Sequence, residues 1–207
     1  ATAANFETRT NGATHMGNDD ALVFYALAHI KIVDISCPQQ MLAFIKWSME
    51  GNRGLVYVRV MRTPSAVLYG PDYVFEFGRG NVLLEGQDDA AVIVSAGRGV
   101  HEALAAAEIC RKAGVSVAVV DMPSIDEALL LRLMTSGKLV CLAEQNNGFI
   151  LQNMMKVLFK HRDTHPAALD RLMTINTLDL NGQPHYIHSG TYEELVEAFG
   201  LTPAALE

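Results

Sequence analysis

The chain alternates between segments with a helical spacing of apolar residues and short runs that are apolar throughout, a pattern typical of helices covering a parallel sheet. In the N-terminal third the order is helix, strand, helix, strand. The helices are predicted at 19–29 and 37–52, and the strands at 30–36 and 54–60. Two strands alone would make a marginal sheet. We therefore expect the chain as given to begin inside a domain or to lean on a partner chain.

The C-terminal part continues the alternation over a longer stretch. Strands are predicted at 90–97, 115–122, 138–145 and 171–178. Helices are predicted at 100–114, 124–137, 149–161 and 191–200, with a further helix start at Pro203. Ser124 with Glu127 and Thr191 with Glu194 have the spacing of capping boxes, in which each side chain caps the other residue's backbone N–H. The pattern indicates a complete α/β domain.

A stretch without sustained periodicity, 62–80, separates these parts. It contains two prolines and three glycines, and it is expected to include a short strand. The fold class is therefore α/β, with a partial three-layer domain followed by a second domain built on a mostly parallel sheet. We assign residues 1–70 to the first domain, 71–89 to the connection and 90–207 to the second domain.

Composition narrows the class of protein. Half of the 207 residues are hydrophobic and the formal net charge is −7, which argues against nucleic acid or an anionic membrane as a partner. Cys37, Cys110 and Cys141 are widely spaced, which fits free thiols in a reducing compartment. No apolar run has the roughly 18 to 20 residues of a membrane helix, and the N-terminus lacks the features of a secretion signal. We expect a cytoplasmic protein.

Several polar features have both a chemical and a structural interpretation. Gly97 and Gly99 follow a strand and open a helix, as in dinucleotide-binding folds, and Asp121 ends the next strand. Glu102 replaces the small residue expected third, which favours a tight turn. Glu144, at a strand end, is either a base or a cap of the following turn.

The histidine pairs are interpreted as solvated loop residues. His161 with His165, and His185 with His188, each lack a third ligand at metal spacing. We therefore predict no metal site.

The loop "TNGATHMGNDD", residues 10–20, is more specific. Asn11 and Gly12 form a turn dipeptide, and Asn18 or Asp19 can cap the next helix. His15, just ahead of that helix, is placed to meet an anionic or carbonyl substrate.

Two arginines add to this picture. Arg59 and Arg62 end the strand "YVRVMR", where a guanidinium needs an anionic partner or an exit to solvent. The loop and the strand end are therefore expected to face one crevice.

Taken together, these features resemble the transketolase family of thiamine-diphosphate enzymes. "NGATHMGNDD" is similar to the family's Asp-Gly-Pro-Thr-His loop, and "GLVYVRVMR" to its strand that ends in arginine. "FEFGRGNVLLEGQDDAAVIVSAGRGVHEALAAAEI" resembles the start of the family's C-terminal domain, and "TYEELVEAFGLTPAAL" its closing helix. The resemblance covers essentially the whole chain and implies the end of a pyrimidine-binding domain followed by a transketolase C-terminal domain.

The resemblance implies roles for four residues. His15 would face the substrate near the reactive carbon of the cofactor and assist proton transfer. Arg62 would hold a sugar phosphate, and Arg59 would bind substrate or form a structural ion pair. Asn11 stands where the family has an aspartate that helps to select sugar hydroxyls, so the identity of the sugar is open.

The resemblance also implies what lies elsewhere. The cofactor-activating glutamate of the family lies upstream of the histidine loop, and thiamine diphosphate with its divalent metal, Mg or Ca, is held by another domain. "AEQN" at 143–146 is similar to the motif around that glutamate, but Glu144 falls in the wrong domain and is left out of the catalytic set. The implied partners are sugar phosphates and an N-terminal diphosphate-binding domain or subunit, in a homodimer or heterotetramer.

Three alternatives stay open at the level of the sequence. Deoxyxylulose phosphate synthase and the pyrimidine-binding subunits of 2-oxoacid dehydrogenases share the architecture. A third possibility is that the C-terminal domain is a noncatalytic assembly or regulatory module.

Overall fold

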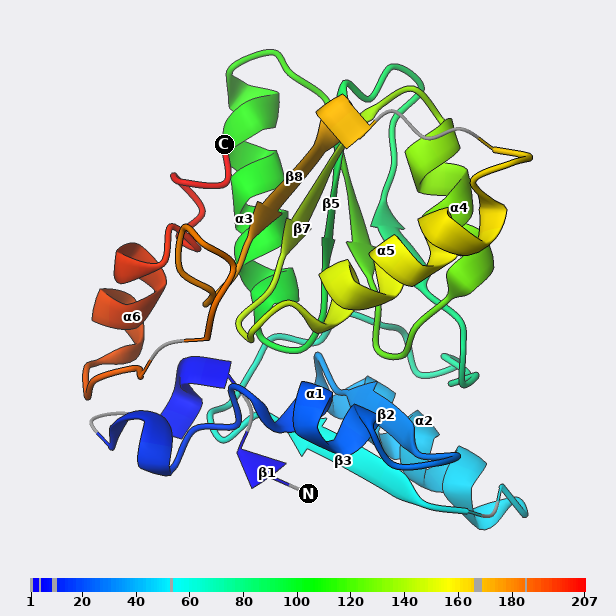
Figure 1. Cartoon of the computed structure of the whole chain (residues 1–207), viewed down its shortest axis with the longest axis vertical. Coiled ribbons are helices and arrows are strands. Elements are labelled where there is room, and N and C mark those ends of the chain that lie inside the picture. Colours follow the sequence, from blue (N-terminus) through cyan, green and yellow to red (C-terminus); the bar gives the residue numbers. More distant parts are fainter. Residues whose placement is uncertain (1, 4, 9–10, 53, 166–168, 185) are drawn as a thin grey trace.

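A computed structural model describes residues 2–3, 5–8, 11–52, 54–165, 169–184 and 186–207. The chain forms two α/β units, each built on its own sheet. In Figure 1 the N-terminal unit lies below the second sheet, across the ends of its strands. The α/β class and the mostly parallel second sheet are confirmed.

The first sheet has three parallel strands in the order β1 (Thr2–Ala3), β3 (Val56–Val60) and β2 (Lys31–Asp34). Helices α1 (Asp20–Tyr25) and α2 (Pro38–Met49) belong to this segment. Pro38 occupies the first turn of α2, where its missing N–H costs nothing. A small core of Val33, Ile35, Phe44 and Phe75 joins the sheet, α2 and the connection. The two predicted strands are present, and the short β1 adds a third.

The second sheet has the strand order β4-β6-β5-β7-β8, parallel except for β4 against β6. Its strands are β4 (Asn81–Leu84), β5 (Ala91–Ser95), β6 (Val117–Asp121), β7 (Leu139–Ala143) and β8 (Leu172–Ile175). Its helices are α3 (Gly99–Lys112), α4 (Glu127–Thr135), α5 (Phe149–His161) and α6 (Tyr192–Ala198).

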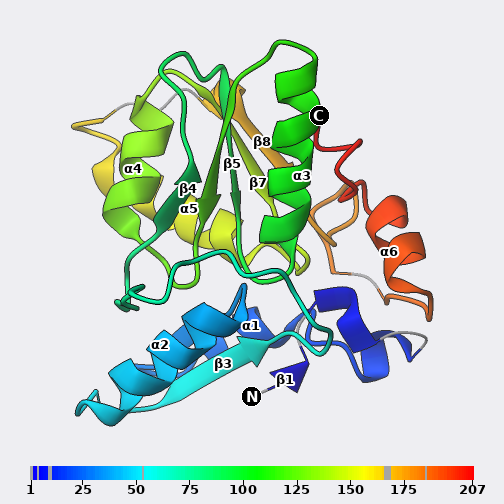
Figure 2. The ribbon, with the colours of Figure 1, turned by 180° about the vertical axis from the view of Figure 1, so that it is seen from behind.

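Helices cover both faces of this sheet. Seen from either side, α3 and α6 lie on one face and α4 and α5 on the other (Figures 1 and 2). The alternation along β5 explains the two cores: Ile93 packs with the α3 alanines, whereas Val92 and Val94 pack with Leu130 of α4 and Met154 of α5. Cys37, Cys110 and Cys141 are free thiols, as predicted, and the structure shows that all three are buried.

Three local predictions were wrong. No strand lies within 62–80; β4 begins only at Asn81. The start of α4 is capped by Asp126, whose carboxylate accepts a hydrogen bond from Leu129 N at 2.9 Å, while the Ser124 hydroxyl accepts one from Gly78 N at 2.8 Å. No helix restarts at Pro203, because the last residues form only a turn. The capping box of Thr191 and Glu194 at α6 is confirmed.

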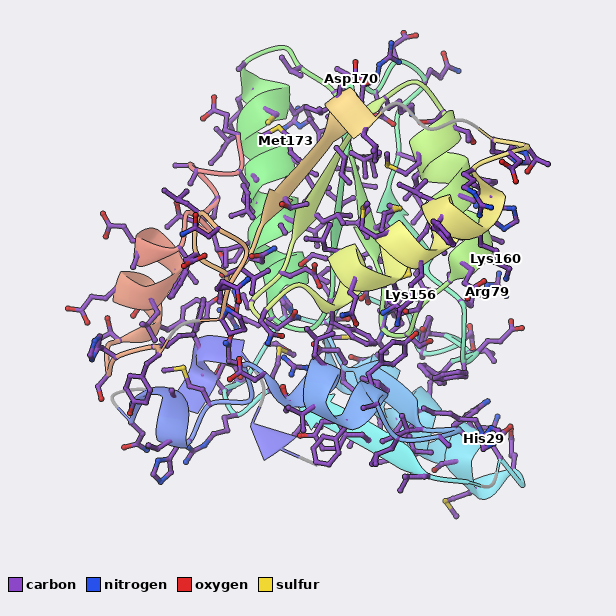
Figure 3. The ribbon with its side chains drawn as sticks, in the orientation of Figure 1. His29, Arg79, Lys156, Lys160, Asp170 and Met173 are labelled. Atoms are coloured by element: carbon purple, nitrogen blue, oxygen red, sulfur yellow. The ribbon has the colours of Figure 1, made fainter. Side chains whose placement is uncertain are left out.

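The carboxyl ends of β5, β6 and β7 point at the N-terminal segment, and backbone contacts join the two parts (Figure 2). Asp34 N donates to Pro123 O at 2.8 Å, and Asn147 N to Asn18 O at 3.4 Å. Lys156 of α5 is at the same junction (Figure 3). Its ammonium lies 4.0 Å from the ring centre of Tyr25 of α1. The usual ligand-binding edge of an open α/β sheet is therefore occupied by the chain itself. No helix in the described part of the chain is long and apolar enough to cross a bilayer.

Candidate functional site

The histidine loop is fixed on one side by the segment that precedes α6. Gly12 has a φ of +65°, and a Cβ on it would lie 3.0 Å from Ser189 N. Ala13 N donates to Ile187 O at 3.0 Å. Glycine is required here by both the left-handed backbone and the close approach. The loop is thus held against residues that follow it by more than 170 positions.

On its other side the loop is held by Asn147 of the β7–α5 turn and by Thr177, which follows β8. The Thr177 hydroxyl donates to Asn18 Oδ1 at 2.8 Å, and Asn147 Nδ2 donates to Asp19 Oδ1 at 3.2 Å. Asp19 occupies the N-cap position of α1, yet its side chain makes no capping hydrogen bond. The side chains predicted to cap α1 therefore bind the second domain instead.

His15 itself is exposed on this fixed loop. Its Nδ1 lies 2.8 Å from Thr14 Oγ1, and the Thr14 hydroxyl also lies 3.2 Å from the carbonyl oxygen of Asn11. Because Thr14 fixes the ring through Nδ1, Nε2 is the nitrogen available to a ligand. The Asn11 side chain is exposed on the same short turn.

Arg59 is 1% exposed and forms a buried ion-pair group. Its Nε donates to Asp34 Oδ2 at 2.8 Å, and its Nη1 contacts Asp20 Oδ1. Burial raises the pKa of Asp34 in spite of the adjacent guanidinium. Both carboxylates come from the first segment, so Arg59 ties β3 to β2 and α1, in line with its interpretation as a structural ion pair.

Arg62 lies beyond the end of β3 and is exposed. Its backbone N–H donates to Glu7 Oε2 at 2.5 Å. The predicted residues thus have separate surroundings: Arg59 lies with Asp34, Arg62 with Glu7, and His15 on the loop packed against 187–189. Substrate binding by Asn11, Arg59 and Arg62 stays a prediction.

Glu144 caps a helix. It is 2% exposed, and its oxygens accept hydrogen bonds from Ile150 N at 2.5 Å and Leu151 N at 3.0 Å, in the first turn of α5. Burial raises the pKa of this carboxyl to about 7. Asn146 Oδ1 accepts from Gly148 N and Phe149 N, both at 2.9 Å. These contacts support the capping interpretation of the "EQNN" turn.

Gly99 and Asp121 serve packing rather than an exposed nucleotide site. A Cβ on Gly99 would lie 2.4 Å from Ser95 Oγ, so the glycine permits close approach of α3 to β5. Asp121 is fully buried and accepts hydrogen bonds from Ser36 Oγ at 2.6 Å, Gln40 Nε2 at 2.8 Å and Tyr69 OH at 2.5 Å. Burial raises its pKa to about 6. All three donors come from residues 1–70, so Asp121 is engaged at the junction with the first segment.

The histidine pairs form no metal site in the part of the chain that is described. His161 and His165 have ring centres 5.9 Å apart, and His188 packs edge-on against Tyr186. His185 lies outside the described residues. No group of three or more His, Cys, Asp or Glu side chains among those described could hold a metal ion.

Two residues that organise this region were missed at the level of the sequence. Asp121 was noted only as a possible nucleotide ligand, although a carboxylate ending an all-apolar strand was the available signal for a buried network. Glu7 carries no such signal, because it precedes every long helix and strand of the chain.

The sequence is similar to a family model and to several known proteins. A family model described as the C-terminal domain of transketolase matches residues 78–206. Transketolase of Rattus norvegicus is 34% identical over 161 residues, which are 75% of this chain and 24% of that protein. A putative transketolase C-terminal section of Methanocaldococcus jannaschii is 30% identical over 127 residues, 60% of this chain and 39% of that protein.

Solved structures show the same fold. A split gene transketolase, described as an inactive beta4 tetramer, superposes with a TM-score of 0.77 at 27% identity, over 100% of this chain and 62% of that one. A transketolase of Pichia stipitis superposes with a TM-score of 0.72 at 17% identity, over 100% of this chain and 28% of that one. The chain spans between 13% and 40% of the length of the curated relatives it matches.

Proposed function

The chain belongs to the transketolase family, as its C-terminal section, and from this premise we propose that it completes the active site of a thiamine-diphosphate-dependent transketolase. The reaction would pass a two-carbon ketol unit from a ketose phosphate to an aldose phosphate. The observation that carries the proposal is the exposed His15 ring, oriented by Thr14 on a loop fixed from both sides.

Each proposed residue has one task. His15 hydrogen-bonds the oxygens of the donor sugar and moves protons as the carbon–carbon bond breaks and forms. Arg62 pairs with the sugar phosphate through its planar donor fork, and Asn11 hydrogen-bonds a sugar hydroxyl. Arg59 keeps β3 in register behind them. When bound, thiamine diphosphate supplies the carbon nucleophile of the reaction.

The described residues do not fit the part of the site that activates this cofactor. Activation requires a carboxyl group within reach of the aminopyrimidine ring. Glu144 is 2% exposed and engaged with α5, and Asp121 is fully buried among three donors. We therefore assign the activating carboxylate, the cofactor and its Mg or Ca ion to the upstream part of the protein or to a partner subunit.

An assembly follows from the same premise. The first sheet has three strands, and β1 contributes only two residues to it. The split gene homologue is described as a tetramer. We propose that an N-terminal diphosphate-binding domain or subunit adjoins this segment, in a homodimer or heterotetramer.

The reaction class is tested on the assembled enzyme with alternative donors. With ribose 5-phosphate as the acceptor, we expect the enzyme to consume xylulose 5-phosphate as the donor and not to consume pyruvate. Consumption of pyruvate with glyceraldehyde 3-phosphate would instead identify a deoxyxylulose phosphate synthase. Oxidative decarboxylation of a 2-oxoacid would identify a dehydrogenase subunit.

The role of His15 is tested by His15→Ala in the same assembly. Loss of a positioned acid–base group is expected to lower kcat/KM for ketol transfer roughly 10²- to 10⁴-fold. His165→Ala is the matched control, because His165 is also exposed and also has a threonine hydroxyl, that of Thr164, at its Nδ1. Unchanged turnover in His15→Ala would remove this histidine from the site.

A specific observation favours a second candidate for the C-terminal domain, a noncatalytic assembly module. The edge of its sheet where ligands usually bind is filled by contacts to the first segment, such as Asp34 N to Pro123 O. Full turnover of the assembled His15→Ala enzyme would favour this alternative for the chain as a whole.

A further inference from the structure

We propose that Glu7 is the positioning residue for Arg62, so that it determines the affinity for the phosphorylated end of the sugar. This inference rests on the proposed function and deepens it, because it assigns the residue that sets the geometry of phosphate binding. Glu7 lies on a short 3-10 helix, η1 (Asn5–Thr8), ahead of the histidine loop.

The Glu7 carboxylate is 2% exposed and directed at the segment that carries Arg62. Oε2 accepts hydrogen bonds from Arg62 N at 2.5 Å and Thr63 N at 3.3 Å. Oε1 accepts one from the Thr63 hydroxyl at 2.5 Å. One carboxylate thus holds three successive donors of this segment.

The segment needs such an anchor because it has left the sheet. Strand β3 ends at Val60, where its pairing with β1 also ends. Thr63 precedes Pro64, and a residue before proline is restricted to extended conformations. With its N–H held and a stiff residue after it, Arg62 has a fixed backbone direction, and its exposed side chain starts from a defined point.

The anchor is tied to the second domain by charge. Arg98, the residue before α3, has its Nη1 3.7 Å from Glu7 Oε1 and its Nε 3.8 Å from Glu102 Oε1. Its guanidinium lies 5.1 Å from the ring centre of Tyr192, whose hydroxyl donates to Glu102 Oε1 at 2.9 Å. Arg98, which contacts Glu102 of α3 and Tyr192 of α6, therefore links Glu7 to the second domain.

The kinetic consequence is specific. A phosphate group remote from the reacting carbons is bound alike in the ground and transition states, so weakening its contact raises KM and leaves kcat unchanged. Glu7→Gln places an amide NH₂ against N–H and hydroxyl donors. We expect the KM for xylulose 5-phosphate to rise about tenfold, as for the loss of one charge-assisted hydrogen bond, and the KM for unphosphorylated xylulose to stay the same.

The experiment measures both KM values in the assembled enzyme for Glu7→Gln, Arg62→Ala and the double variant. Glu108→Gln is the control, because Glu108 pairs with Arg111 on the exposed face of α3. If Glu7 acts through Arg62, Glu7→Gln adds nothing once Arg62 is alanine. Should Glu7→Gln fail to assemble, Thr63→Val removes only the hydroxyl contact and is expected to raise the same KM by a smaller factor.

Amide hydrogen exchange supplies a measurement that does not depend on turnover. In Glu7→Gln the amides of Arg62 and Thr63 are expected to exchange faster than in the wild type. Unchanged exchange, equal KM effects on both sugars, or additive effects in the double variant would each overturn the positioning role. If the amides of Arg62 and Thr63 are protected in the wild-type assembly but the assembly does not act on xylulose 5-phosphate, the proposed function is overturned, and the phosphate-binding role with it. The hydrogen bonds from Arg62 and Thr63 to Glu7 would then still stand.

Discussion

Two carboxyl groups end strands of the second sheet, and burial raises the pKa of both: Glu144 to about 7 and Asp121 to about 6. Their ordinary values are 4.5 and 3.8. The folded state therefore binds these protons more tightly than the unfolded state. The resulting stabilisation is complete below the ordinary values and is lost as the pH rises through 6 and 7.

The pH dependence gives a prediction for Glu144. Between about pH 5 and pH 8 the free energy of unfolding of the wild type is expected to fall by roughly 1–3 kcal/mol more than that of Glu144→Gln. The variant has no titrating group at position 144. Urea unfolding at a series of pH values measures the difference. Glu127→Gln, at an exposed ion pair with Lys160, is the control. Parallel curves for wild type and Glu144→Gln would contradict the assignment.

At the residue scale, features that depend on neighbouring residues could be predicted from the sequence, whereas contacts between distant residues could not. The Asn11–Gly12 turn and the position of His15 on a loop ahead of a helix follow from short-range residue preferences, and the structure has both. For Arg59 the sequence predicted either an anionic partner or an exit to solvent, and the structure shows the first, with Asp34 as a partner. Nothing in the sequence pairs Glu7 with Arg62, because these residues are 55 positions apart and their contact depends on how the chain between them folds.

At the element scale, the boundaries follow the strength of local signals. The strongly periodic stretch 149–161 is helical over its whole predicted length, as α5. Helix α4 begins later than predicted because Asp126, rather than Ser124, accepts the capping hydrogen bond. The strand expected within 62–80 lies at 81–84, because β4 forms only where β6 is available for antiparallel pairing.

Helix α6 offers a test of an element whose cap was predicted correctly. Thr191 Oγ1 accepts a hydrogen bond from Glu194 N, and Phe199 after the helix stacks on Phe6 of η1 at 5.4 Å. Thr191→Ala is expected to lower the free energy of unfolding by about 1 kcal/mol. Thr164→Ala, at an exposed turn, is expected to change it far less. Equal effects in denaturant unfolding would show that the cap contributes nothing.

At the scale of the whole molecule, the two segments form one interlocked unit. Asp121 of β6 binds Ser36, Gln40 and Tyr69, and the histidine loop is fixed by residues 187–189. The α/β class and the mostly parallel second sheet could be predicted from periodicity alone. The junction could not, because hydrophobic patterning specifies which face of an element is buried and not which distant element covers it.

The same scale explains why a C-terminal section is proposed to act only in an assembly. The described residues present an exposed histidine, His15, whereas the carboxyl groups at two strand ends, Glu144 and Asp121, are buried and hydrogen-bonded. Under the proposed function, the cofactor is held next to His15 by a second domain or subunit.

The most direct measurement is a titration of this chain into the N-terminal diphosphate-binding part of the enzyme, with thiamine diphosphate and Mg²⁺ present. Ketol transfer from xylulose 5-phosphate to ribose 5-phosphate is followed at each ratio. We expect neither part to be active alone and the rate to rise to a plateau at equal numbers of the two parts. Full activity of the N-terminal part alone, or none at any ratio although the complex forms, would contradict the account.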